Sequence, residues 1–212
     1  MDTETTFNYR DKDGQRIRVT AEPSLTHRNS CRFVIDPPVY EAGAVHFPNM
    51  EKAVDSPLAA ALFEIEGITT VTVAGNSVTT TTDEDADWEK LSEEVAMRIR
   101  DQINSGLPGI SEEITRNLPD AETVREKVQE VIDTSVNPSV AAHGGVVNLL
   151  DVKDNTVYLE FGGGCQGCGM VSVTLKYGVE RLIRERVPEV GQILDTTDHA
   201  SGQNPYYAPA SK

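Results

Sequence analysis

Two cysteines three positions apart, Cys165 and Cys168, have the residue type and spacing most suited to chemistry in this chain. They lie in FGGGCQGCGMVSVTLK, between a β-prone run and a helical apolar pattern. The free amide groups of a helix start favour thiolate over thiol. The surrounding glycines, Gly162, Gly163, Gly164, Gly167 and Gly169, let the backbone approach a bulky inorganic group and donate hydrogen bonds to sulfur. We therefore expect a nucleophilic, uncrowded site.

Such a cysteine pair is compatible with three uses. Thiol–disulfide exchange usually takes place in a larger βαβ fold, often with a proline near the pair, and here Gln166 and Gly167 intervene. Structural zinc needs four closed ligands, but the chain has no second pair, and His143 and His199 are isolated in sequence. A 4Fe-4S cluster normally takes four thiolates, so two chains meeting at their motifs would complete the set. The residues alone leave all three uses open.

The remaining candidate residues favour structural roles. Cys31 precedes a β-prone run and is predicted to be a small buried hydrophobic residue. Trp88 begins an apolar helical stripe, which favours core packing. His143 is expected in an exposed turn before Gly144, and the acidic run 83–87 lacks the spacing of a calcium loop, so we interpret it as a solvated turn.

Composition limits the class of protein. The chain has 212 residues, 34 of them acidic and 19 basic, for a net charge of −15. This charge repels phosphate backbones, so we expect no nucleic-acid partner. We find neither an apolar run of membrane-spanning length nor a signal-peptide pattern, and therefore expect a cytoplasmic protein without a membrane partner. Three cysteines are an odd number, which argues against a secreted disulfide framework and favours reduced thiols.

The first part of the chain predicts strands, a helix, a hairpin and a second helix. Alternating apolar residues around Gly14 indicate one hairpin within residues 5–20, and short β-prone runs follow at 31–35 and 45–47. Ser56 and Pro57 are typical of a helix start, and Gly67 suits a left-handed helix end. The segments 68–73 and 78–82 predict a second hairpin, and apolar spacing predicts a helix over 88–103.

A second domain is expected after a linker rich in glycine and proline at 105–119, within which a helical turn could occupy 111–117. Asp120 is the predicted N-cap of a helix that Asn137-Pro138 weakens or ends. Strands are expected at 146–152 and 156–161, then the cysteine motif, then a helix ending at Pro188 and a possible strand at 190–194. The predicted fold class is α+β: an N-terminal domain (1–104) with an antiparallel sheet and two helices, and a C-terminal αββα(β) domain (120–198) followed by a tail (199–212).

Two stretches resemble a known family. Residues 137–207, above all GGGCQGCGMVSVTLKYGVE, resemble the C-terminal domain of Nfu/NifU-type iron-sulfur proteins, and residues 32–103, with SPLAAALFEIEGITTV and DWEKL, look like the Nfu N-terminal domain. The resemblance implies a non-enzymatic scaffold or carrier that holds a 4Fe-4S cluster at a homodimer interface through Cys165 and Cys168. It would receive the cluster from an upstream donor and deliver it to apo-proteins. The chain lacks the additional cysteines of the longest NifU relatives, which favours carriage over assembly.

Overall fold

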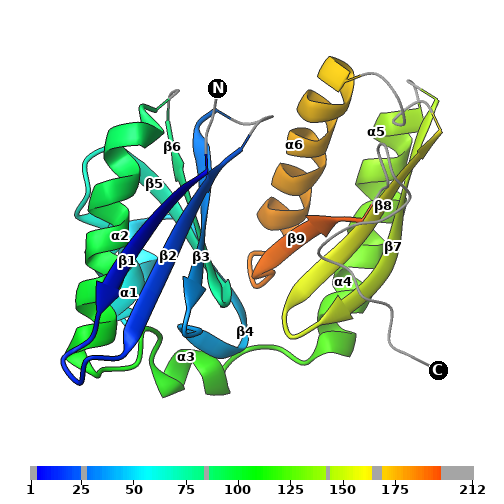
Figure 1. The fold of residues 1–212 in the computed structure, drawn as a ribbon. Helices are drawn as coiled ribbons and strands as arrows, with labels where there is room; N and C mark the ends of the chain where they lie inside the picture. Colours follow the sequence, from blue (N-terminus) through cyan, green and yellow to red (C-terminus); the bar gives the residue numbers. More distant parts are fainter. Residues whose placement is uncertain (1–3, 25–27, 84–85, 142–143, 164–168, 197–212) are drawn as a thin grey trace, which may run out of the picture. The chain divides into compact units, whose positions relative to one another are not determined.

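The computed structural model describes residues 4–24, 28–83, 86–141, 144–163 and 169–196, and it describes side chains in the last helix from Leu175 onward. The chain divides into two compact units, Met1–Leu118 and Pro119–Lys212, each with its own hydrophobic core. Both units combine strands and helices (Figure 1), which confirms the predicted α+β class. No helix in the described ranges is both long and apolar enough to cross a bilayer.

The first unit contains a six-stranded antiparallel sheet in the order β1-β2-β3-β6-β5-β4. Gly14, at φ +81°, forms the turn between the first two strands, as the sequence predicts. The strands are β1 (Thr5–Arg10), β2 (Arg16–Pro23), β3 (Ser30–Asp36), β4 (Tyr40–Phe47), β5 (Ile68–Gly75) and β6 (Ser77–Thr82). Both predicted hairpins, 5–20 and 68–82, are therefore confirmed.

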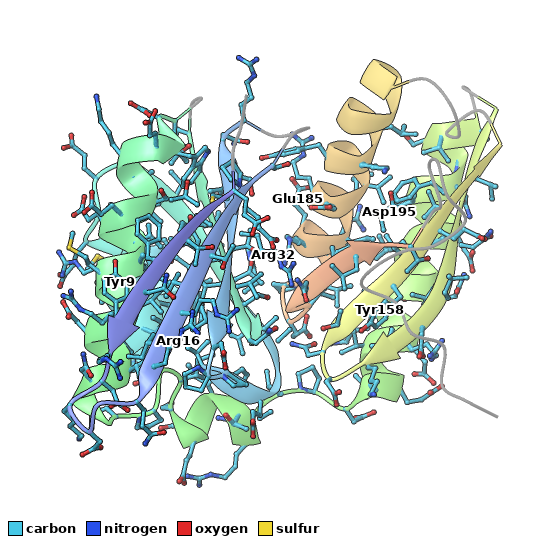
Figure 2. The ribbon with its side chains drawn as sticks, viewed as in Figure 1. Tyr9, Arg16, Arg32, Tyr158, Glu185 and Asp195 are labelled. Atoms are coloured by element: carbon cyan, nitrogen blue, oxygen red, sulfur yellow. The ribbon has the colours of Figure 1, made fainter. Side chains whose placement is uncertain are left out.

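Helices α1 (Pro57–Phe63) and α2 (Trp88–Ser105) cover one face of this sheet, and a short 3-10 helix, η1 (Met50–Ala53), precedes them (Figure 1). Ser56 caps α1 because its Oγ accepts a hydrogen bond from the Ala59 amide (3.2 Å) and donates one to the Gly109 carbonyl (2.8 Å). Trp88 is 7% exposed, and its indole N–H donates to the Arg28 carbonyl (2.7 Å), so the predicted core role is confirmed. Tyr9 of β1, labelled in Figure 2, lies under the guanidinium of Arg100, 5.1 Å from the ring centroid.

The segment 105–119, expected to be a linker, belongs almost entirely to the first unit. Ile110 is 3% exposed within the core, and the Ser111 amide donates to the Asp55 carbonyl (3.0 Å). The expected helical turn is present as α3 (Glu112–Arg116), and the Tyr40 hydroxyl lies 3.1 Å from Thr115 Oγ1. The glycines and prolines therefore bend this segment back onto the sheet and its helices.

The second unit begins with α4 (Ala121–Val131), followed by a π turn, η2 (Ile132–Val136), and α5 (Asn137–Ala141). Asp120 is the N-cap, as predicted, with Oδ1 accepting from the Thr123 amide (2.9 Å). The α-helical pattern breaks at Val131, ahead of Asn137-Pro138, and the π turn carries the chain into α5. Asn137 then binds the sheet, because its side chain donates to the Val147 carbonyl (3.1 Å) and accepts from the Val147 amide (2.8 Å).

A three-stranded sheet completes the second unit in the order β7-β8-β9. β7 (Gly145–Lys153) and β8 (Thr156–Gly163) are antiparallel, and β9 (Gln192–Asp195) pairs with β8 in parallel. The long helix α6 (Gly169–Arg186) connects β8 to β9, and its Val179 and Ile183 are buried in the core, as is Val187 just after the helix. The predicted αββα(β) order is therefore confirmed, including the final strand.

Candidate functional site

The cysteine motif connects the end of β8 to the start of α6. β8 ends at Gly163 and α6 begins at Gly169, one residue after Cys168, so the chain follows the predicted strand-motif-helix order. Cys165 and Cys168 themselves lie outside the described residues, and their role as ligands stays a prediction. The first turn of α6 has amide groups without intrahelical partners, and such groups favour a thiolate nearby.

Two glycines end β8, and the backbone around Gly163 requires a glycine at that position. Gly163 pairs with Gly145 of β7 and has φ +64°; a Cβ there would lie 2.4 Å from the Gly144 carbonyl oxygen. At Gly162, a Cβ would lie 2.9 Å from Cγ1 of Val146. The sequence suggested that these glycines give clearance to an inorganic group. The structure gives Gly163 a local reason as well, because the backbone just before β7 lies too close for any side chain there, whereas at Gly162 the nearest atom belongs to the side chain of Val146.

Charged side chains of α6 follow the motif in sequence, and the sequence analysis singles out neither Lys176 nor Glu180. Lys176 forms an ion pair with Asp195 at the end of β9, and its Nζ lies 5.5 Å from the ring centroid of Phe161 in β8. Glu180 follows one turn later, and burial raises the pKa of its carboxyl, an effect opposed by nearby Arg184. A signal was present in the sequence: Lys176, Glu180 and Arg184 recur every four residues and so lie along one side of the helix.

The third cysteine is separate from the motif. Cys31 is 0% exposed in the core of the first unit, and burial raises the pKa of its thiol to about 12. A protonated, inaccessible thiol neither binds metal nor attacks an electrophile readily. The prediction of a buried hydrophobic role for Cys31 is confirmed.

The histidines add little to the site. His143, expected in a turn, lies outside the described residues, as do His27 and His199. His46 of β4 has its Nδ1 2.8 Å from Thr72 Oγ1 of β5. Within the described ranges, no group of three or more histidine, cysteine, aspartate or glutamate residues is arranged to hold a metal ion.

Fold and motif together define a two-domain α+β protein with a Cys-x-x-Cys motif between a strand and a helix of the second domain. Two family models match the chain: "Scaffold protein Nfu/NifU N terminal" over residues 21–106 and "NifU-like domain" over residues 128–194. Each model matches within one of the two structural units, the first within Met1–Leu118 and the second within Pro119–Lys212. The chain belongs to the Nfu/NifU-type family.

Named relatives match about two fifths of the chain. A protein of Pseudomonas aeruginosa, "Fe/S biogenesis protein NfuA", is 51% identical over 85 residues, which is 40% of this chain and 44% of that protein. The protein of the same name from Pseudomonas savastanoi pv. phaseolicola is 47% identical over 88 residues, 40% of this chain and 45% of that protein. The match therefore spans a little under half the length of these relatives.

Among solved structures, the solution structure of a NifU-like protein from Saccharomyces cerevisiae is similar. The two chains share 17% sequence identity with a TM-score of 0.40, and the match covers 45% of this chain and 85% of the yeast protein. A crystal structure of a Staphylococcus aureus protein matches 37% of this chain and 93% of its own, at 13% identity and a TM-score of 0.31.

Proposed function

We propose that this protein is an iron-sulfur cluster carrier that holds a 4Fe-4S cluster between two chains, through Cys165 and Cys168 of each, and transfers it to apo-proteins. The observation that carries the proposal is the segment GGGCQGCGMVSVTLKYGVE, which runs from the end of β8 into α6 of a NifU-like domain. The names of the Pseudomonas relatives, which refer to Fe/S biogenesis, support it.

Ligand number explains why two chains are needed. A 4Fe-4S cluster takes four thiolates, and the motif offers two per chain. Cys31 is not a candidate for a third ligand, because it is buried in the core of the other unit. A cluster-loaded homodimer joined at the motifs satisfies the count. Its cluster is the cargo of the protein, and a client's cysteines can replace the thiolates one at a time.

Each of the two domains is assigned its own role. We assign cluster binding to residues 120–198 and recognition of clients or of an upstream cluster donor to residues 1–104, against which segment 105–118 packs, with 199–212 as a tail. The protein acts as a non-enzymatic carrier in the cytoplasm, where thiols stay reduced. Neither a nucleic acid nor a membrane is part of the proposed cycle.

Anaerobic reconstitution of the full chain with iron and sulfide tests the proposal. We expect about four irons per two chains and a native mass of a dimer. Cys165→Ala and Cys168→Ala should each abolish cluster retention without loss of the fold. The matched control is Cys31→Ala, which also removes one thiol and should retain the cluster.

Two other outcomes would refute the carrier. Stoichiometric zinc in a folded monomer, with loss of folding in Cys165→Ala, would identify a zinc-stabilised interaction module. Rapid disulfide turnover with no iron retained would identify a thiol-disulfide oxidoreductase that uses the same cysteines.

A further inference from the structure

Helix α6 and strand β9 are joined at both ends of the strand. Arg184 Nη1 donates to the Val190 and Gly191 carbonyls (3.0 and 3.2 Å) just before β9, and Lys176 forms its ion pair with Asp195, the last residue of β9. Eight helix residues span about 12 Å. Four strand steps from Gly191 to Asp195 span about 13 Å. The two contacts therefore fit a helix and a strand that run antiparallel.

The Lys176–Asp195 pair is shielded from water and fixed in place. The two side chains are only 19% and 21% exposed. Asp195, labelled in Figure 2, pairs with Leu159 of β8, and the next residue, Thr196, donates its amide and its hydroxyl to the Leu159 carbonyl (2.7 and 3.0 Å). The carboxylate therefore belongs to a firmly held strand end, and partial burial strengthens its attraction to the ammonium group.

Lys176 also contacts the strand that leads into the motif. Its Nζ lies 5.5 Å from the ring centroid of Phe161, which is 2% exposed and two residues before Gly163. Of the charged side chains described in α6, Lys176 is the one nearest the motif in sequence, whereas the fully buried apolar residues begin at Val179. One ammonium group, on the eighth residue of α6, thus contacts both β8 and β9.

We propose that Lys176 and Asp195 are positioning residues for the cysteine ligands. Their ion pair fixes the N-terminal part of α6 against the ends of β8 and β9. It thereby sets the relative position of the two points, Gly163 and Gly169, between which the motif is held. This inference rests on the proposed function in one respect: its expected consequence is tight retention of the cluster.

Cluster retention by the full chain is the first test. We compare Lys176→Met, which keeps the length of the side chain, with Asp195→Asn and with the double variant. Each single variant should lose its cluster to an iron chelator about tenfold faster, as for other residues that orient metal ligands. The double variant should be no worse than Lys176→Met, because that single change already removes the ion pair with Asp195. Lys176→Arg should restore slow loss.

The matched control is Arg181→Gln, on the same helix. Arg181 forms an exposed ion pair with Glu185 (3.4 Å; side chains 73% and 56% exposed). We expect its cluster loss to stay within about twofold of the wild type, since exposed pairs contribute little. Equal loss rates in Lys176→Met and Arg181→Gln would overturn the proposal.

Hydrogen exchange in the apo-protein separates this proposal from the proposed function. Amides 173–176 of α6, which donate to the carbonyls of the first helical turn, should exchange faster in Lys176→Met and Asp195→Asn than in Arg181→Gln, while β7 and β8 amides stay protected. If the wild type takes up no cluster, the carrier function fails and the exchange result still decides the positioning role. Uniformly faster exchange across the second unit would make the pair an ordinary fold contact and would overturn the proposal.

Discussion

Replacement of Gly163 by alanine tests whether the close approach of β7 and β8 fixes the entry to the cysteine motif. Gly163 has φ +64°, a conformation that costs about 1–2 kcal/mol for a residue with a Cβ. The new Cβ would also lie 2.4 Å from the Gly144 carbonyl oxygen. That oxygen belongs to backbone, so it cannot rotate away as a flexible side chain would.

The expected loss of stability follows from these two contributions. Relief of an overpacked contact usually costs about 1–3 kcal/mol. Together with the backbone conformation, Gly163→Ala should lower the free energy of unfolding of the second unit by about 2–5 kcal/mol. For a domain of this size, such a loss lowers the melting temperature by about 10 °C or more.

Gly178→Ala provides a matched control in the same unit. Gly178 is an exposed helical residue, and a Cβ there would meet nothing within 4 Å. Alanine at this position should stabilise the second unit by about 0.5–1 kcal/mol. Far-UV circular dichroism follows both units, whereas tryptophan fluorescence reports the first unit alone, because Trp88 is the single tryptophan of the chain. The fluorescence transition should be unchanged in both variants.

Two results would contradict this reasoning. A Gly163→Ala variant as stable as the wild type would mean that β7 and β8 separate at this end without cost. A destabilised Gly178→Ala variant would mean that helix α6 is packed differently from the arrangement described above. If the Gly163→Ala variant were fully stable but lost the cluster, Gly163 would be required by the cluster site and not by the pairing of β7 with β8.

Three further predictions concern single groups. In the native apo-protein, an alkylating reagent should modify the two motif thiols but leave Cys31 unmodified until unfolding, as counted by mass spectrometry, because Cys31 is buried and its pKa is raised to about 12. The pKa of Asp120 is lowered by hydrogen bonds from the first turn of α4. The ionised carboxylate therefore stabilises the folded protein above the pKa that Asp120 has in the unfolded chain, and this stabilisation is lost as pH falls through the pKa in the folded protein. The stability advantage of the wild type over Asp120→Asn in urea titrations should therefore shrink at acid pH. Ser56→Ala should destabilise the first unit by about 1–2 kcal/mol, measured by Trp88 fluorescence, because it removes the cap of α1 and a buried bond to a backbone carbonyl.

Local signals in the sequence predicted most of the elements. A glycine in a turn, as at Gly14, or a hydroxyl or carboxylate before an apolar run, as at Ser56 and Asp120, acts on its immediate neighbours, so the printed sequence contains the whole cause. These three positions have the predicted conformation or caps in the structure. The helix after the motif was predicted for the same reason, since its apolar spacing is a local property.

Contacts between distant residues were predicted less well. The burial of Ile110 depends on the core of the first unit, which no local pattern reveals, so the sequence alone predicts a linker at 105–119. Likewise, the partner of Lys176 is 19 residues away on a strand whose pairing with β8 is parallel, and that pairing was not predictable. Gly163 has two physical explanations, and only the register of β7 against β8 shows that the nearest obstruction to a side chain there is the chain's own backbone.

The elements on either side of the motif, β8 and α6, are held within one chain, whereas the ligands of the proposed cluster come from two chains. β8 is held by the close pairing with β7, and α6 is held to β9 by Arg184 and Lys176, so both ends of the motif are anchored within one domain. With only two thiolates per chain, however, the proposed cluster depends on a second chain for half of its ligands. Release of the cluster then requires exchange of thiolates at the seam between chains. It does not require unfolding of the domain, because the anchors of β8 and α6 lie within each chain.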